Sequence, residues 1–122
     1  MLGVISFLLV VSALAITAAI LVSIHDGRDV PANGPGGVHL TAGEVVGRGL
    51  FAQTCATCHT LAAVNAVARV GPDLDVLKPP AGLVLYAIQH GFAGAQGSMP
   101  AGLYSGRDAH DIAAFVAAVA GR

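Results

Sequence analysis

The sequence of 122 residues predicts an all-α protein with an N-terminal transmembrane helix, a flexible linker and a small helical domain. Three observations lead to this fold class. The chain starts with a long uncharged apolar segment, continues with a stretch dense in glycine and proline, and then carries helix-capping patterns followed by apolar residues at helical spacing. We therefore expect a transmembrane anchor helix over residues 1–25, a Gly/Pro-rich linker over 26–40 and a helical domain over 41–122.

The N-terminal segment has the length and composition of a membrane anchor. A helix over Leu2–Ile24 can cross the roughly 30 Å hydrocarbon core of a bilayer, and the segment has no charged side chain. A cleaved signal peptide is the alternative, and Ala13-Leu14-Ala15 fits its small-x-small cleavage pattern. However, the segment lacks a basic residue ahead of its core, and that core exceeds the roughly 7–15 residues of a signal peptide. We therefore expect an uncleaved single-pass helix that contacts the lipid bilayer through residues 1–25.

The next region is expected to be a tether without regular structure. Glycine and proline recur throughout Asp26–Leu40, and this density of helix breakers is typical of a linker. We expect His25 and His39 to be exposed to solvent and not to serve as ligands.

The sequence Cys55-Ala56-Thr57-Cys58-His59 carries the strongest chemical signal in the chain. This C-x-x-C-H pattern is typical of covalent attachment of a c-type haem. Two thiols three positions apart can lie on one side of a helical turn and add to the two vinyl groups of one porphyrin. The adjacent His59 then has its ring under the iron, for which a neutral imidazole nitrogen is a good axial ligand.

Other uses of these two cysteines fit the sequence less well. A structural zinc site needs a second pair of ligands, and the sequence offers no such pair. The remaining histidines are scattered along the chain: His25, His39, His90 and His110. A thioredoxin-like redox pair needs strand–helix–strand alternation nearby, whereas the flanks of this motif have helical patterns. A disulfide between Cys55 and Cys58 stays open as the simplest alternative.

The domain over 41–122 contains three helix patterns. Thr41-Ala42-Gly43-Glu44 and Ser105-Gly106-Arg107-Asp108 both have the capping-box form, with a hydroxyl at the cap and a carboxylate three residues on. Gly91 is expected to end the middle helix. The expected apolar stripes are Val46, Leu50 and Phe51 in the first helix, Leu83, Val84, Ala87 and Ile88 in the second, and Ile112, Phe115, Val116 and Val119 in the third. Gly47 and Gly49 weaken the first helix, which suggests close contact with another element.

Over Thr41–Arg122 the chain resembles the class I cytochrome c family. The resemblance rests on motifs that occur in the family's order: Gly47 and Phe51 ahead of the cysteines, Gly71-Pro72-Asp73-Leu74, Met99-Pro100, and Phe115 near the C-terminus. It implies a small cytochrome c domain of about three main helices around one covalently bound haem c.

The resemblance also implies roles for individual residues. The haem would be attached through Cys55 and Cys58, and His59 and Met99 would hold its iron. The Pro72 carbonyl would accept the other ring N–H of His59 and fix its orientation. In addition, Leu74 would lie against the porphyrin. Away from the haem, Gly47 would pack against Phe115.

Met99 is also singled out by composition. The chain has two methionines, and the other is Met1. Met99 follows a Gly-rich loop over Phe92–Ser98, which can fold back over the distal haem face more easily than a helix can. His90 is a rival candidate for the sixth ligand, but a cation near the C-terminal end of a helix is the commoner reason for a histidine there.

This ligand set predicts an electron carrier and not an independent enzyme. With His59 and Met99 on both axial positions, no open site remains for a substrate. We expect single-electron transfer by a membrane-anchored carrier, or by the cytochrome c subunit of a respiratory complex. Its haem domain would lie on the periplasmic side of the cytoplasmic membrane, where the family attaches haem. The alternatives are an electron-accepting haem subunit of a dehydrogenase, or a haem gas sensor if Met99 is labile.

Charge composition limits the partners. Only 11% of residues are charged and the net charge is −1, so nothing indicates a nucleic-acid partner or a polybasic membrane arm. Soluble shuttles commonly use a lysine-rich face for steering, but Lys78 is the only lysine here. A membrane tether can replace steering by effective concentration. We therefore expect a membrane-embedded redox complex as partner, with mobile carrier and fixed subunit both open.

Overall fold

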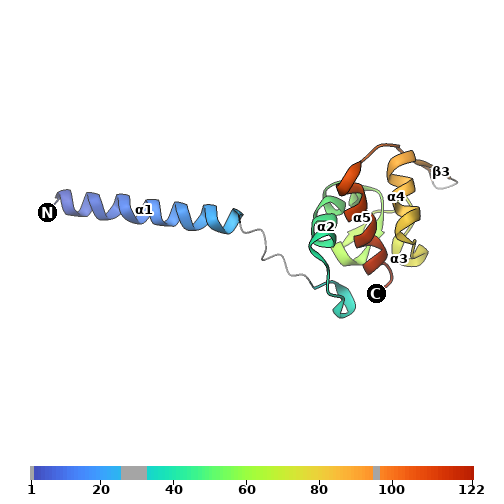
Figure 1. Ribbon diagram of the computed structural model, residues 1–122, viewed down its shortest axis with the longest axis horizontal. Helices are drawn as coiled ribbons and strands as arrows, with labels where there is room; N and C mark the ends of the chain where they lie inside the picture. The colour runs from blue at the N-terminus through green and yellow to red at the C-terminus, as the bar shows by residue number, and fades with distance from the viewer. Residues whose placement is uncertain (1, 26–32, 95–96) are drawn as a thin grey trace. The chain divides into compact units, whose positions relative to one another are not determined.

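The computed structural model describes residues 2–25, 33–94 and 97–122 (Figure 1). The chain divides into two compact units, Met1–Pro31 and Ala32–Arg122. Among the described residues, the first unit contains a single helix and the second contains all other elements.

Helix α1 (Leu2–His25) is the element of the first unit. By length and composition it can cross a membrane, and its side chains from Gly3 to Leu21 are exposed. Ser12 and Thr17 donate their hydroxyls to carbonyls of the same helix, at 2.9 and 2.8 Å, so these polar groups are satisfied internally. The predicted apolar helix is therefore confirmed, and both a membrane anchor and a signal peptide are compatible with it.

Three helices dominate the second unit. They are α2 (Ala42–Thr54), α4 (Ala81–His90) and α5 (Gly106–Val119), with 13, 10 and 14 residues. Shorter helical segments precede α2 or lie between α2 and α4: η2 (Pro35–Gly37) comes first, followed after α2 by η3 (Cys55–Thr57), η4 (Ala62–Val64) and α3 (Leu74–Leu77). The predicted all-α class with about three main helices is confirmed.

The second unit also has two short antiparallel ladders, and the later one lies in the segment that the sequence predicted as a Gly-rich loop. Strand β1 (Thr60–Leu61) pairs with β2 (Ala66–Val67), and β3 (Phe92–Gly94) pairs with β4 (Gly97–Met99). Pairing satisfies backbone groups that would otherwise lack partners. Strands of two or three residues are too short to produce an alternating apolar pattern, so they could not be predicted from the sequence.

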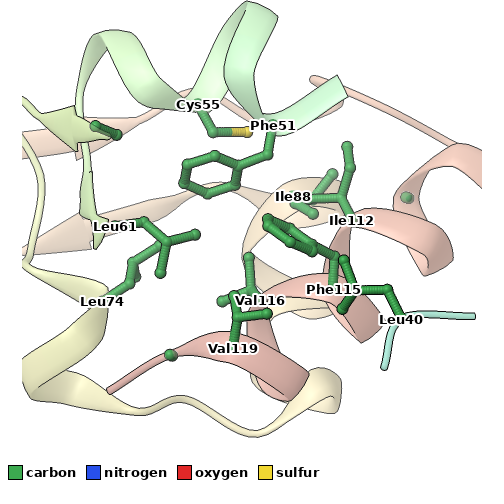
Figure 2. Packing of buried hydrophobic residues seen from close by; sticks show 13 residues of the cluster. Leu40, Phe51, Cys55, Leu61, Leu74, Ile88, Ile112, Phe115, Val116 and Val119 are labelled. Carbon is green, nitrogen blue, oxygen red and sulfur yellow. The ribbon is translucent and has the colours of Figure 1, made fainter. Parts of the chain in front are cut away.

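Helix α5 is the centre of the core (Figure 2). Its stripe of Ile112, Phe115, Val116 and Val119 is at most 1% exposed, as predicted. The helix packs most extensively against α2 and next against α4, and Figure 1 draws it in red beside both.

Helices α2 and α5 cross at Gly47. A Cβ atom there would overlap the Asp111 carbonyl and lie 2.8 Å from the Ile112 nitrogen, so only glycine permits this approach of the two backbones. Phe115 packs edge to face against Phe51, with ring centroids 6.2 Å apart. The tightest neighbour of Gly47 is therefore the α5 backbone, and not the Phe115 ring that the resemblance implied.

Two details of the predicted α2 face were wrong. Val46 is 49% exposed, because the buried face of the helix runs through Gly47 and Phe51. A Cβ atom on Gly49 would have no neighbour within 4 Å, so Gly49 makes no close contact with another element.

The two capping boxes differ. At the start of α2, the Thr41 hydroxyl accepts the Glu44 N–H at 3.3 Å and the Glu44 carboxylate accepts the Thr41 N–H at 2.7 Å, as predicted. Ser105 is the N-cap of α5, but its side chain accepts no hydrogen bond. Gly106 has a φ of 56°, so the first residue of α5 lacks helical geometry and the second box does not form.

The predicted linker differs from the structure over residues 33–40, whereas residues 26–32 lie outside the described ranges. Asn33 forms a β-bridge with His39, and the Gly34 N–H donates to the Val38 carbonyl at 2.7 Å. Leu40 is 6% exposed and belongs to the core. The Val38 and Leu40 side chains pack in the core of the second unit, which holds this segment in place despite its glycines. His39 is exposed, as predicted.

Candidate functional site

A cavity of about 640 Å³ lies between α2, α4, α5 and the loops that join them. This volume is in the range of small-molecule and cofactor sites, and most of the lining side chains are apolar. The lining includes the six residues that the sequence predicted for the site: Cys55, Cys58, His59, Pro72, Leu74 and Met99.

One side of the cavity, here called the proximal wall, consists of Cys55–His59 and Gly71–Leu74. The first part forms the 3₁₀ turn η3 directly after α2, in which the Cys58 and His59 N–H groups both donate to the Cys55 carbonyl, at 3.1 and 3.0 Å. The Gly71 N–H donates to the Cys58 carbonyl at 2.7 Å. These bonds hold both thiols and the imidazole against the same cavity.

The ring of His59 is oriented by the backbone. Its Nδ1 lies 2.9 Å from the Pro72 carbonyl oxygen. Because a carbonyl only accepts, Nδ1 must carry the proton, and Nε2 is left with a free lone pair for a metal. This is the contact that the resemblance implied for Pro72.

The ring is also confined by Gly71. A Cβ atom on Gly71 would lie 2.6 Å from Cε1 and 2.9 Å from Nδ1 of His59. The glycine is therefore needed for space beside the imidazole.

Two aspartates fasten the short helix α3 beneath this wall. The Asp73 carboxylate caps α3 by accepting the Asp75 and Val76 N–H groups, at 2.9 and 3.3 Å. The Asp75 carboxylate accepts the Ala62 N–H at 2.7 Å and the Gly121 N–H at 2.8 Å. Asp75 thus joins α3 to the preceding loop and to the C-terminus.

A second part of the lining, here called the distal wall, comes from Phe92–Gly94 and Gly97–Leu103. Met99 is half-buried at the end of β4, where it pairs with Phe92. Gly91 ends α4, as predicted, with a φ of 73°. A Cβ atom on it would lie 2.6 Å from the Met99 carbonyl oxygen, so the hairpin folds back tightly over the end of α4.

The stripe predicted for α4 forms a side of the cavity. Leu83, Val84, Ala87 and Ile88 all line it. Ile88 is 1% exposed, whereas Leu83 is 42% exposed. Helical periodicity located this face correctly, but could not distinguish a core contact from a cavity wall.

Burial changes the chemistry of one thiol. Desolvation, reinforced by the neighbouring Cys58, raises the pKa of Cys55 from 9.0 to about 11. A free thiol here is protonated at neutral pH and is a poor nucleophile. The environment favours uncharged sulfur, which is the state of sulfur in a thioether.

Comparison with known proteins agrees with this site. Residues 42–116 match the family described as cytochrome C oxidase, cbb3-type, subunit III. The solved structure of the c-type cytochrome SorU from Sinorhizobium meliloti is similar, with 38% sequence identity and a TM-score of 0.59, over 66% of this chain and 93% of that chain. No curated protein was found to match.

The chain belongs to this family of c-type cytochromes. Such a domain implies electron transfer and a covalently bound haem c. The cavity fits this group, because two thiols and an oriented imidazole lie on one wall of an otherwise mainly apolar space. When bound, the haem supplies an iron that gains and loses one electron.

The other histidines of the cytochrome domain lie away from the cavity. Among the histidines whose side chains the structure describes, His59 is the one that lines it. His90 is exposed, stacks on Tyr86 with ring centroids 4.5 Å apart, and uses Nδ1 on the Tyr86 carbonyl at 3.1 Å. His39 and His110 are exposed.

Sequence reasoning missed two interactions near the site. The first is the pair of hydrogen bonds that Asp75 accepts from Ala62 and Gly121. An aspartate at a helix start indicates an N-cap, which could have identified Asp73, but no such pattern indicates the bonds of Asp75. The hydrogen bond between the hydroxyls of Thr54 and Tyr104, at 2.8 Å, joins residues 50 positions apart. No local pattern could have indicated it.

Proposed function

We propose that this protein is a membrane-anchored monohaem cytochrome c that transfers single electrons, with His59 and Met99 as the axial ligands of its iron. The observation that carries the proposal is that an oriented imidazole and a thioether line the same cavity as both thiols. The single C-x-x-C-H motif is the basis for one haem.

Met99 is the best sixth ligand that the distal wall offers. Among the residues that the structure describes, the polar side chains that line the cavity, besides Cys55, Cys58 and His59, are the hydroxyls of Thr54, Thr57 and Ser98. A thioether is a common axial ligand of cytochromes c and raises the reduction potential. With both axial positions filled by protein, the iron has no position for a substrate, which favours a carrier over a catalyst.

The membrane part of the proposal rests on α1. Its apolar stretch Gly3–Leu21 has 19 residues, which gives a helix of about 28 Å and matches the hydrocarbon core. We place the cytochrome domain on the periplasmic side, where c-type haem is attached. The proposed partner is a membrane-embedded redox complex, which the tethered domain can reach without a lysine-rich surface.

Substitution of Met99 tests the ligand set. Met99→Ala should keep the haem through denaturing electrophoresis, lower the reduction potential by on the order of 0.1 V, and bind CO rapidly when reduced. Leu103→Ala is the matched control, because Leu103 lines the same cavity from the same segment without a ligand atom. If the Met99→Ala variant has the same reduction potential and CO reactivity as the control, Met99 is not a ligand of the iron. Rapid CO binding by the parent protein would favour a gas sensor instead.

Membrane extraction tests the anchor. The full-length protein should stay in membranes after washing with alkaline carbonate, and mass spectrometry should find Met1–Ile24 intact. A mature N-terminus at or beyond Ile16 would indicate a cleaved signal peptide. Purification in mild detergent should then recover the cytochrome together with its redox partner.

A further inference from the structure

We propose that the hydrogen bond between Thr54 and Tyr104 is a latch that keeps Met99 on the haem iron; this inference rests on the ligand set proposed above. The two hydroxyl oxygens lie 2.8 Å apart in a partly buried position. Thr54 is the last residue of α2 and is directly followed by Cys55. Tyr104 follows the distal wall, five positions after Met99.

The latch connects two parts of the domain that carry opposite ligands. The haem is attached through Cys55 and Cys58, so its position follows the end of α2. Met99 instead follows α4. The Gly102 and Leu103 N–H groups donate to the Ile88 carbonyl, at 3.0 and 3.3 Å. The backbone bonds downstream of Met99 therefore fix it relative to α4.

Helix α2 is held mainly by α5 and not by α4. In the part of the chain that the structure describes, the Thr54–Tyr104 bond is the side-chain hydrogen bond that joins α2 to the segment after Met99. Its length sets how closely that segment approaches the end of α2. Loss of this bond would let the segment after Met99 separate from the end of α2, and Met99 would then leave the iron more readily.

The Thr54 hydroxyl bonds to Tyr104 and not to a carbonyl of its own helix. A threonine hydroxyl near the end of a helix can bond to a carbonyl of the preceding turn, and Thr57 does so with the Thr54 carbonyl at 2.7 Å. The Thr54 hydroxyl bonds to Tyr104 instead. A phenylalanine would fill the same space as Tyr104, so the phenol oxygen adds only this contact.

The test is the rate at which the reduced full-length holoprotein, in detergent, binds CO after rapid mixing. That rate is limited by release of Met99. Tyr104→Phe and Thr54→Val should each raise it about threefold to tenfold, as expected for one lost hydrogen bond. The double variant should be no faster than either single variant, because both remove the same bond. Thr54→Ser keeps the hydroxyl and should retain the parental rate.

Tyr86→Phe is the matched control. Tyr86 is the other tyrosine of the chain, and its 54% exposed ring stacks on His90 outside the cavity. Equal CO rates for the parent, Tyr104→Phe and Tyr86→Phe would overturn the latch, as would a lower unfolding free energy of Tyr104→Phe with an unchanged CO rate. A parent without a Met–iron charge-transfer band would overturn both the ligand set and the latch, whereas a normal band with unchanged rates overturns the latch alone.

Discussion

The proximal and distal walls of the haem cavity are built in different ways. The proximal wall combines a contiguous motif with a backbone network, and its residues Cys55 and Leu74 are each 8% exposed. The distal wall is a short hairpin whose residue Phe92 is 55% exposed, and it is held at its ends by Gly91 and Gly102. Under the proposed ligand set, attachment of the cofactor is therefore determined locally, whereas the position of the sixth ligand depends on how distant segments pack.

The largest expected effect distinguishes covalent attachment of the haem from ligation of its iron. Cys55→Ala combined with Cys58→Ala should abolish haem retention, because both thioether positions are lost, whereas each single variant should weaken it. The measurement is haem staining after denaturing electrophoresis. Met99→Ala is the comparison from the distal wall and should stain like the parent. A double cysteine variant that still retains haem would mean that attachment lies elsewhere.

The distal wall should be most sensitive at Gly91. Its φ of 73° and ψ of 178° lie in a region that is essentially restricted to glycine. An added Cβ would also lie 2.6 Å from the Met99 carbonyl oxygen. Gly91→Ala should lower the unfolding free energy by about 2–4 kcal/mol, from strain and overlap together, and reduce the Met–iron absorption band.

Gly94→Ala is the control for this prediction. It lies in the same hairpin, and among the described residues its Cβ would meet the Phe92 ring alone, at 3.7 Å. Its stability and spectrum should match the parent. Equal behaviour of the two alanine variants would mean that the close turn at Gly91 does not position Met99.

The proximal wall should respond at Gly71. A Cβ atom there would lie 2.6 Å from Cε1 of His59, whose ring is held by the Pro72 carbonyl and, in the proposed ligand set, also by the iron. Gly71→Ala should cost about 1–3 kcal/mol of unfolding free energy. Gly49→Ala, in open space on α2, should instead raise stability by up to about 1 kcal/mol. Chemical denaturation of both holoproteins checks the sign of each change.

The sequence was most informative for features that depend on a few neighbouring residues. The motif Cys55–His59, the capping box at Thr41 and the apolar stripe of α5 are each encoded over a few neighbouring residues. The N-terminal apolar helix was likewise evident from length and composition. These features follow from helical spacing and local hydrogen bonding, so they could be predicted without a structure.

Other features depend on contacts between distant segments. The close contact of Gly47 with the α5 backbone, the packing of residues 33–40 and the Thr54–Tyr104 bond all join parts far apart in sequence. The strands of the distal hairpin are too short for a periodic signal. Local sequence patterns predict the type of secondary structure and its apolar face, but tertiary packing determines which other segment that face contacts.

The smallest expected effect concerns the clamp beneath the proximal wall. Asp75 accepts backbone N–H groups of Ala62 and Gly121 with its two oxygens, at 2.7 and 2.8 Å. Asp75→Asn keeps one acceptor and points an amide donor at the other N–H, so the unfolding free energy should fall by about 1 kcal/mol in this partly exposed position. Asp108→Asn, in the exposed first turn of α5, is the control and should cost only a few tenths of a kcal/mol. Because the hydrogen-bond partners of the Asp75 carboxylate in the described residues are Ala62 and Gly121 and not His59 or Met99, the reduction potential should stay at the parental value in both variants. A shift in the potential of Asp75→Asn would mean that the clamp also sets the orientation of His59 through Pro72.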